Sequence, residues 1–384
     1  MLRAGLVRNL VVIGLIAVSC GPVHQPASSS GAAASGPRVT TASGARILGS
    51  CSSVRPAPHF RTSASSNRNL EIVWLKASQK FVVRDITDIL HPTTVSTFED
   101  LGPLQFVSAS ELSTVGGDLV RMPLSGSPRT TVASPCNGTF GIAWSPDGTA
   151  AAYVTDLSDY SASELHLISG GQNRVASSMP RVPITGCVAP CADIVDLRLL
   201  YSPNGAYVSF ASYWGPPLIR IWTSDGKLVG SIDAHNSGVG SGPTMSVWSG
   251  NSLLFRDNQG IHVWRDGAQS LLVPGVAWIR PKASPAGGQI VYAAKDQTGK
   301  PNVFILDTSS GSVRMIAKVR SEPAFLNSHL IWYKEERPCA SGDAYPCGSV
   351  ATIETGKTYI YDLQDNTETE SVIAAVWDVW PHGA

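Results

Sequence analysis

The stretch GIAWSPDGTAAAYVTD, residues Gly141–Asp156, shows most clearly the unit from which the fold is inferred. Ile142 and Trp144 alternate with smaller residues, which is typical of a strand that packs on one face. The sequence SPDG at 145–148 suits a tight turn, because Pro fixes φ, Asp accepts hydrogen bonds from the nearby backbone and Gly adopts positive φ. The apolar run Ala150–Val154 then returns as a second strand. The stretch therefore predicts a β-hairpin.

This hairpin recurs along the chain. It returns at Leu199–Phe210 (LLYSPNGAYVSF) and more loosely at Trp278–Ala293 (WIRPKASPAGGQIVYA). Each copy should be followed by an alternating strand that ends in a turn, and seven such strands are found. They are Phe81–Asp85, Leu119–Leu124, Leu165–Gly171, Ile219–Gly226, Ile261–Gly267, Val303–Gly311 and Tyr359–Asn366. Six intervals separate the first residues of these strands and cover 359 − 81 = 278 residues, or about 46 each. A four-stranded unit with a period of about 40–45 residues indicates a β-propeller.

The two ends of the repeat region complete one another. Asn69–Lys76 and Phe81–Asp85 have the pattern of the second and third strands of a blade that lacks its first strand. Ala375–Gly383 (AVWDVWPHG) has the pattern of a first strand with nothing after it. We therefore predict an all-β chain whose residues 67–384 form a single propeller of seven blades, each of four antiparallel strands. The N- and C-terminal strands close the ring within one blade. Six or eight blades remain alternatives.

The repeat units resemble the TolB-type and WD40-like β-propellers of bacterial envelopes. The resemblance lies in Trp144–Gly148, Tyr201–Gly205, Ser284–Gly287 and the WD40-like run Ile219–His235. It implies the propeller fold and gives little guidance on function. TolB proteins also carry an α/β domain before the propeller, which the residues preceding Asn67 do not resemble. A TolB role is therefore not implied.

The N-terminus predicts export. Arg3 and Arg8 precede an apolar run, Leu10–Val18, that is too short to span a bilayer as a helix. The sequence AVSC at 17–20 resembles the lipobox of bacterial lipoproteins, in which the Cys is lipidated. Residues 1–19 are thus predicted to be a lipoprotein signal peptide, and Cys20 the lipid anchor on the extracytoplasmic side of the cell membrane. Residues 20–66 are rich in Ser, Ala, Gly and Pro, which predicts a flexible tether.

Charge excludes one class of partner. The chain has 29 basic and 29 acidic side chains, and no long basic patch occurs in it. A nucleic-acid partner is therefore not expected.

Loop lengths suggest where a ligand would bind. Two turns of each blade are short: the one between its first and second strands and the one between its third and fourth strands. They lie on the same face of the ring, which we call the short-turn face. The other connections share the opposite, long-loop face and hold most of the inserted residues, including the long segment Lys334–Lys357. Variable loops on a rigid ring are typical binding positions. The candidate binding residues on this face are Asp156, Asp159, Tyr160, Tyr213, Trp214 and Tyr345.

Six cysteines follow Cys20, and an even number in an exported chain favours disulfides. The simplest pairing is Cys187 with Cys191, Cys339 with Cys347, and Cys51 with Cys136, among fifteen connectivities. A metal site built from these pairs lacks a neighbouring His, and Asp156 and Asp159 lack the spacing of an EF-hand. The tryptophans other than Trp214 are expected to pack between blades on strands.

No catalytic motif is found. The chain has no GxSxG, no Walker sequence and no GxGxxG after a strand, so no catalytic residue, metal or cofactor is predicted. The first hypothesis is a membrane-anchored module that binds an envelope protein or peptide. The alternative is an extracytoplasmic propeller enzyme, a lyase, lactonase or glycan or peptide hydrolase, with its site at the channel mouth.

Overall fold

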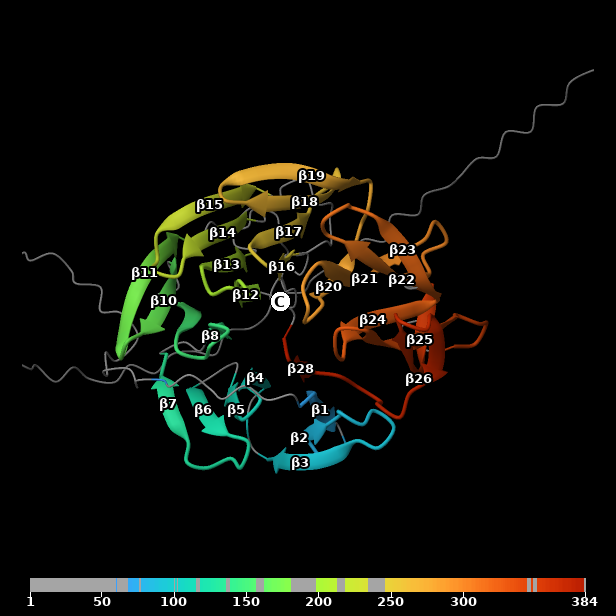
Figure 1. Cartoon of the computed structure of the whole chain (residues 1–384), viewed down its shortest axis with the longest axis horizontal. Coiled ribbons are helices and arrows are strands. Elements are labelled where there is room, and N and C mark those ends of the chain that lie inside the picture. The colour runs from blue at the N-terminus through green and yellow to red at the C-terminus, as the bar shows by residue number, and fades with distance from the viewer. Residues whose placement is uncertain are drawn as a thin grey trace, which may run out of the picture. The chain divides into compact units, whose positions relative to one another are not determined.

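The structure is a computed structural model, which describes residues 60, 68–75, 77–99, 101, 103–114, 118–135, 139–156, 162–180, 198–212, 218–233, 246–343, 347 and 351–382. These residues form strands and turns, with no helix among them. The strands make seven sheets of four antiparallel strands each. The sheets are arranged as blades around a centre (Figure 1), which confirms the predicted seven-bladed propeller.

The blades follow the chain in order. Blade 1 contains β28 (Asp378–Trp380), β1 (Leu70–Leu75), β2 (Lys80–Asp85) and β3 (Thr93–Phe98). Blade 2 contains β4 (Leu104–Ser108), β5 (Glu111–Thr114), β6 (Leu119–Pro123) and β7 (Thr130–Ala133). Blade 3 contains β8 (Thr139–Trp144), β9 (Ala151–Asp156), β10 (Ala162–Ser169) and β11 (Gln172–Pro180).

Blade 4 contains β12 (Arg198–Tyr201), β13 (Tyr207–Ser212), β14 (Leu218–Thr223) and β15 (Leu228–Asp233). Blade 5 contains β16 (Ser246–Ser249), β17 (Ser252–Arg256), β18 (Gly260–Arg265) and β19 (Ala268–Pro274). Blade 6 contains β20 (Ile279–Ala283), β21 (Gln289–Lys295), β22 (Pro301–Asp307) and β23 (Val313–Lys318). Blade 7 contains β24 (Arg320–Phe325), β25 (Leu330–Pro338), β26 (Thr352–Asp362) and β27 (Thr367–Glu370).

The C-terminal strand closes the ring. β28 pairs antiparallel with β1, in the register Leu70↔Trp380 and Ile72↔Asp378. The predicted closure is therefore confirmed, and β1 has a hydrogen-bonded neighbour on both sides. The edge of β1 is therefore covered, and the short strand β28 takes the place nearest the channel.

The repeated turn has the chemistry that its sequence predicts. In 145–148, Gly148 has φ 69° and its N–H donates to the carbonyl of Ser145 over 2.8 Å. Asp147 accepts from the backbone N–H of Thr149 at 3.0 Å and from the Ser145 hydroxyl at 2.6 Å. In blade 4, Asn204 takes the place of Asp147 and accepts the hydroxyl of Ser202 at 2.7 Å. In these two copies a short side chain with an acceptor oxygen reinforces the turn. Blade 6 has Ala286 at the same position and keeps the backbone hydrogen bond from the Gly287 N–H to the Ser284 carbonyl at 2.9 Å.

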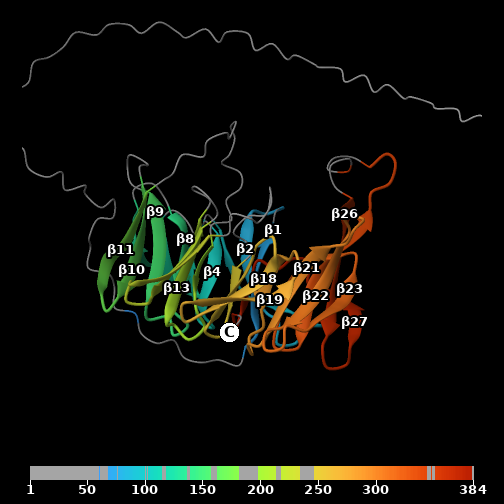
Figure 2. The same ribbon diagram turned by 90° about the horizontal axis from the view of Figure 1, so that it is seen from above.

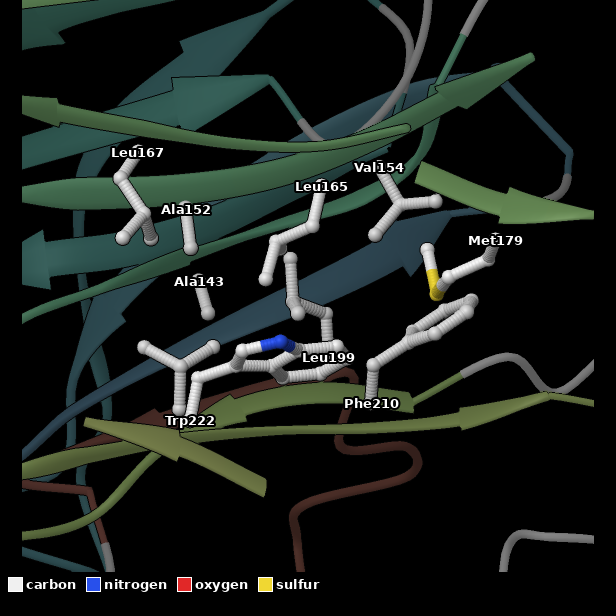
Figure 3. Packing of buried hydrophobic residues seen from close by; sticks show 10 residues of the cluster. Ala143, Ala152, Val154, Leu165, Leu167, Met179, Leu199, Phe210 and Trp222 are labelled. Carbon is white, nitrogen blue, oxygen red and sulfur yellow. The ribbon is translucent and has the colours of Figure 1, made fainter. Parts of the chain in front are cut away.

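The core lies between blades. Among the described residues, seven buried clusters are found, one for each pair of adjacent blades. Figure 3 shows the cluster between blades 3 and 4, where Trp222 and Phe210 pack against Leu165 and Val154. Because both faces of a blade are covered, inner strands can be apolar throughout, and every residue of β9 is buried.

Most tryptophans serve this packing, as predicted. Trp222, Trp264, Trp278 and Trp332 are all at most 1% exposed. The prediction was wrong for Trp74, which is 36% exposed, and for Trp377, which precedes β28 and is 49% exposed. Its indole N–H donates to the carbonyl of Leu104 at 2.8 Å, so the nitrogen is satisfied while much of the ring faces solvent.

Six of the seven outer strands contain a β-bulge. The additional residues are Val95, Val132, Ala176, Val229, Leu272 and Ile316. Each of these residues packs against or belongs to a core cluster. A bulge therefore turns one side chain inward and interrupts an edge that another chain could pair with. The exception, β27, is four residues long and carries Glu368 and Glu370, so charge and shortness protect it.

One carboxylate is buried in the closing blade beside a partly exposed arginine. Glu71 on β1 is opposite Arg84 on β2 and forms an ion pair with it, and the Glu71 side chain is 0% exposed. Leu70 and Ile72 pack toward blade 2, so Glu71 lies on the side of blade 1 that meets blade 7. Burial raises the pKa of Glu71 to about 7, although Arg84 acts in the opposite direction.

The Glu71→Gln variant should therefore differ from the parent in its dependence on pH. In the parent, the raised pKa of Glu71 stabilises the folded state. This stabilisation is complete below pH 4.5 and is lost as the pH rises toward 7. The unfolding free energy of the parent relative to the variant should fall by about 3 kcal/mol over this range. Denaturant titrations at several pH values measure it. Parallel curves for the two proteins would contradict the assignment.

Candidate functional site

The first strands of the seven blades surround a central channel. Residues of β4, β8, β12, β16, β20 and β24 and of the segment around β28 line it, and its volume is about 560 Å³. Figure 1 shows these strands grouped around the centre, with the fourth strands at the outside. The channel is thus the place where side chains from every blade meet.

Two charged residues of the channel lie on strained backbone. Arg280 on β20 has φ 50° and Glu322 on β24 has φ 51°. Each lies at a β-bulge and precedes a proline. A non-glycine residue in the left-handed region costs about 1 kcal/mol or more, and bulges redirect side chains. Arg280 and Glu322 form an ion pair across the two blades.

The pair belongs to a longer chain of charges. Lys334 on β25 places its Nζ 2.7 Å from Oε2 of Glu322 and 3.0 Å from Oε1 of Glu354. Glu322 therefore has two cationic neighbours. The alternating charges extend from the channel wall into the hairpin of blade 7 on the long-loop face. Since these side chains are partly exposed, each pair contributes little to stability by itself.

A second polar group lies at the closing strand. Oδ2 of Asp378 accepts the backbone N–H of Phe106 at 2.8 Å and lies 3.1 Å from Nε2 of His382. Burial would raise the pKa of Asp378, but His382, the Phe106 N–H and the charge of Lys282 together lower it. Asp378 is consequently an anion at neutral pH and a poor general acid.

An apolar surface borders the channel on the long-loop face. Trp74 and Leu75 at the end of β1 are 36% and 44% exposed, and Trp377 also lines the channel. The rings of Trp74 and Trp377 both contact Phe81, with centroids 4.5 and 5.8 Å from it. We call Trp74, Leu75 and Trp377 the rim patch. Exposed aromatic groups of this kind are typical of protein-binding surfaces.

One of the six predicted binding residues, Asp156, lies within the described residues. Asp156, at the end of β9, is 3% exposed and accepts the Ser163 hydroxyl at 2.7 Å, so it joins β9 to β10. The candidates outside the described residues are Asp159, Tyr160, Tyr213, Trp214 and Tyr345. Cys20, Cys51, Cys136, Cys187 and Cys191 also lie outside them, so neither the anchor nor two of the three pairings is described.

The third cysteine pair lies in blade 7. Cys339 and Cys347 are linked by a disulfide, with Cα atoms 5.7 Å apart. Asp343 lies within the loop that they close and receives two hydrogen bonds of 2.8 Å from Arg337. The two sulfurs and Asp343 are close enough to hold a metal, but bonded sulfurs are not thiolate ligands. Much of the predicted insertion Lys334–Lys357 is strand, because the ladder of β25 and β26 continues to Pro338↔Thr352. Figure 2 shows β26 extending beyond the neighbouring strands at one face of the ring.

The sequence patterns above do not point to Arg280, Glu322, Asp378 or His382. A signal for the first two exists: the dipeptides Arg-Pro and Glu-Pro begin at 280 and 322, which is 322 − 280 = 42 residues and one repeat apart. A charged residue before proline in an inner strand therefore indicates a bulge that redirects the charge, since proline within a strand often marks a bulge.

None of the described residues forms a helix that is long and apolar enough to cross a membrane. No family model matches the sequence, and no curated protein matches it.

Solved propellers are similar in fold. TolB from Acinetobacter baumannii is 15% identical with a TM-score of 0.41, and the match covers 82% of this chain and 80% of TolB. The propeller domain of the Trilobed protease from Pyrococcus furiosus is 11% identical with a TM-score of 0.45, covering 83% and 84%. An oligogalacturonate lyase in complex with manganese is 12% identical with a TM-score of 0.46, covering 73% and 92%. The sheet topology makes this chain a seven-bladed β-propeller, similar in fold to TolB and to other propeller domains.

Proposed function

We propose that this chain is a lipid-anchored, extracytoplasmic propeller that binds an envelope protein or a peptide through its long-loop face. The observation that supports this proposal most is the rim patch. Trp377 is 49% exposed beside the channel and Trp74 is 36% exposed, although Trp222, Trp264, Trp278 and Trp332 are buried. Exposed tryptophans are over-represented among the residues that dominate binding energy.

The channel complements the rim patch. Its charged groups already neutralise one another, with Glu322 between Arg280 and Lys334. Such a wall offers both donors and acceptors to an extended backbone that enters it, and it carries no large net field. An aromatic anchor beside mixed polar groups suits a peptide or a protein loop.

The membrane location rests on the sequence. Arg3, Arg8 and the apolar run before Cys20 support export and lipidation, which would tether the ring to the outer side of the cell membrane. Cell fractionation tests this part of the proposal. The parent should remain with membranes, and Cys20→Ala should not. Equal fractionation of the two proteins would oppose it.

Site-specific photo-crosslinking in cells tests the binding face. A crosslinking residue in place of Leu75, which is 44% exposed on the long-loop face, should give a defined adduct that is lost with Trp377→Ala. The matched control replaces Leu228, which is 51% exposed on an outer strand, and should give none. Equal labelling from both positions, or an adduct that survives Trp377→Ala, would count against the proposal.

A second candidate is an enzyme that uses the channel, and the strained Arg280–Glu322 pair favours it. Strained backbone is concentrated at functional sites, where it holds side chains in place. A lyase, lactonase or hydrolase of this kind should turn over a small sugar, lactone or peptide substrate and lose that activity with Glu322→Gln. Turnover that is unchanged by this substitution would exclude a role for the pair.

A further inference from the structure

We propose that Phe60 docks the N-terminal segment onto a preformed site between blades 2 and 3, so that this segment meets the ring at its short-turn face. The docking is argued from contacts within the described residues. Its consequence for orientation rests on the lipid anchor of the proposed function.

Phe60 contacts the ring through two residues. Its ring centroid lies 5.0 Å from that of Trp144, with the planes at 78°, an edge-to-face arrangement. The guanidinium carbon of Arg121 lies 4.9 Å from the Phe60 centroid and 5.0 Å from the Trp144 centroid. Phe60 also packs against the buried cluster between blades 2 and 3. Edge-to-face aromatic pairs and cation–π contacts are both favourable.

The ring holds both partners in place without help from Phe60. Arg121 on β6 is 5% exposed and donates to the two carboxylate oxygens of Glu111 at 3.1 and 2.5 Å. Its Nη1 donates to the carbonyl of Gly148 in the next blade at 2.5 Å. The Trp144 indole N–H donates to Oγ of Ser113 at 2.8 Å. A site whose groups are already oriented loses little entropy when a ring enters it.

The indole contact is a feature of the repeat, and the rest of the site is not. In blade 5, Trp248 donates to Ser209 of the preceding blade at 2.9 Å, in the way that Trp144 donates to Ser113. At that copy, the ring of Tyr207, from the preceding blade, stacks on Trp248 with centroids 5.8 Å apart. At Trp144, the segment before the propeller supplies the aromatic partner.

The sequence makes Phe60 distinctive. It is the only Phe, Tyr or Trp in residues 1–73, within a stretch otherwise rich in Ser, Ala, Gly and Pro. A single aromatic residue in such a background is suited to hold a flexible segment at one point, because neighbouring small residues bury little area.

The position of the site determines which face the segment meets. Trp144 ends β8, and Gly148 belongs to the turn between β8 and β9 on the short-turn face. The rim patch and the hairpin of β25 and β26 in blade 7 are on the opposite face. From Cys20 to Phe60 there are 60 − 20 = 40 residues, and a flexible chain of this length spans about 35 Å on average. A lipid anchor at Cys20 would then direct the long-loop face away from the membrane.

Limited trypsin digestion of the full chain tests the docking. Arg61 directly follows Phe60, so cleavage after Arg61 reports how often this point is released. We expect Phe60→Ala to be cut there about tenfold faster than the parent, which corresponds to one docked aromatic contact. Phe60→Tyr keeps the aromatic face and should be cut at nearly the parental rate. Cleavage after Arg38 in the same samples gives the reference rate.

A spectroscopic measurement checks the ring side of the contact. In protein labelled with ¹⁵N-tryptophan, Phe60→Ala should shift the indole N–H resonance of Trp144, which is assigned by Trp144→Phe, and leave that of Trp248 in place. An unchanged Trp144 resonance, or equal cleavage after Arg61 in the parent and Phe60→Ala, would overturn the docking.

Orientation is tested separately on lipidated protein in vesicles that contain brominated lipids. A fluorescent residue at Lys227, in a turn of the short-turn face, should be quenched more than one at Leu75. Phe60→Ala should abolish this difference. Stronger quenching at Leu75 in the parent would overturn the orientation. Failure to associate with vesicles would refute the anchor of the proposed function, and the trypsin result would still decide the docking.

Discussion

A chain that ends after Val376 is expected to lose the cooperative fold of the ring. The truncation removes β28, its pairing with β1, and Val379, which is 9% exposed within the cluster between blades 7 and 1. It also removes the Asp378 carboxylate that accepts the Phe106 N–H at 2.8 Å. Leu70 and Ile72 would then lie on a strand with an open edge. The loss should exceed about 5 kcal/mol, a large part of the stability of a typical domain.

Thermal unfolding followed by far-ultraviolet circular dichroism measures this effect. The matched control ends after His382, so that β28 and the His382–Asp378 contact remain and Gly383 and Ala384 are lost. The control should unfold with the parent, while the shorter chain should be insoluble or unfold without a cooperative transition. If the chain that ends after Val376 melted at the parental temperature, ring closure would not be what stabilises this propeller.

Trp332→Ala is expected to destabilise the protein by about 3–5 kcal/mol, as for other large-to-small substitutions in a core. Trp332 on β25 is 1% exposed and packs with Leu326, Ile360 and Val379 where blade 7 meets the closing blade. Removing the ring leaves a cavity at the interface that the closing strand completes. The effect should therefore appear as an earlier unfolding transition of the whole ring.

Two variants separate packing from hydrogen bonding at this position. The Trp332 indole N–H donates to the carbonyl of Ile373 at 2.7 Å, and this carbonyl also accepts the Thr358 hydroxyl at 2.7 Å. Trp332→Phe leaves the carbonyl paired, so it should cost about 1–2 kcal/mol. Trp74→Ala, at a 36% exposed position, should cost less than either. Equal destabilisation by Trp332→Ala and Trp74→Ala would show that Trp332 does not hold the interface.

Local sequence patterns are enough to predict the propeller. The SPDG turn at 145–148 and its relative at 202–205 are decided by residues next to one another, since hydrogen bonds and allowed φ values act within a few residues. Repetition of that unit indicated the blades, and the incomplete strand patterns at the two ends indicated how the ring closes. Both inferences depend on local patterns that recur along the chain, so one amino-acid sequence is enough to make them.

Which side chains meet across the blades depends on the tertiary structure. Arg280, Glu322 and Lys334 come from three strands of two blades, and Phe60 reaches Arg121 from a segment before the propeller. Nor does the sequence show that Glu71 is buried beside Arg84, because the facing blade is formed by residues near the other end of the chain. These contacts depend on the rotation and tilt of whole sheets about the channel. Such geometry follows from packing across the ring, and the spacing of residues along the chain does not encode it.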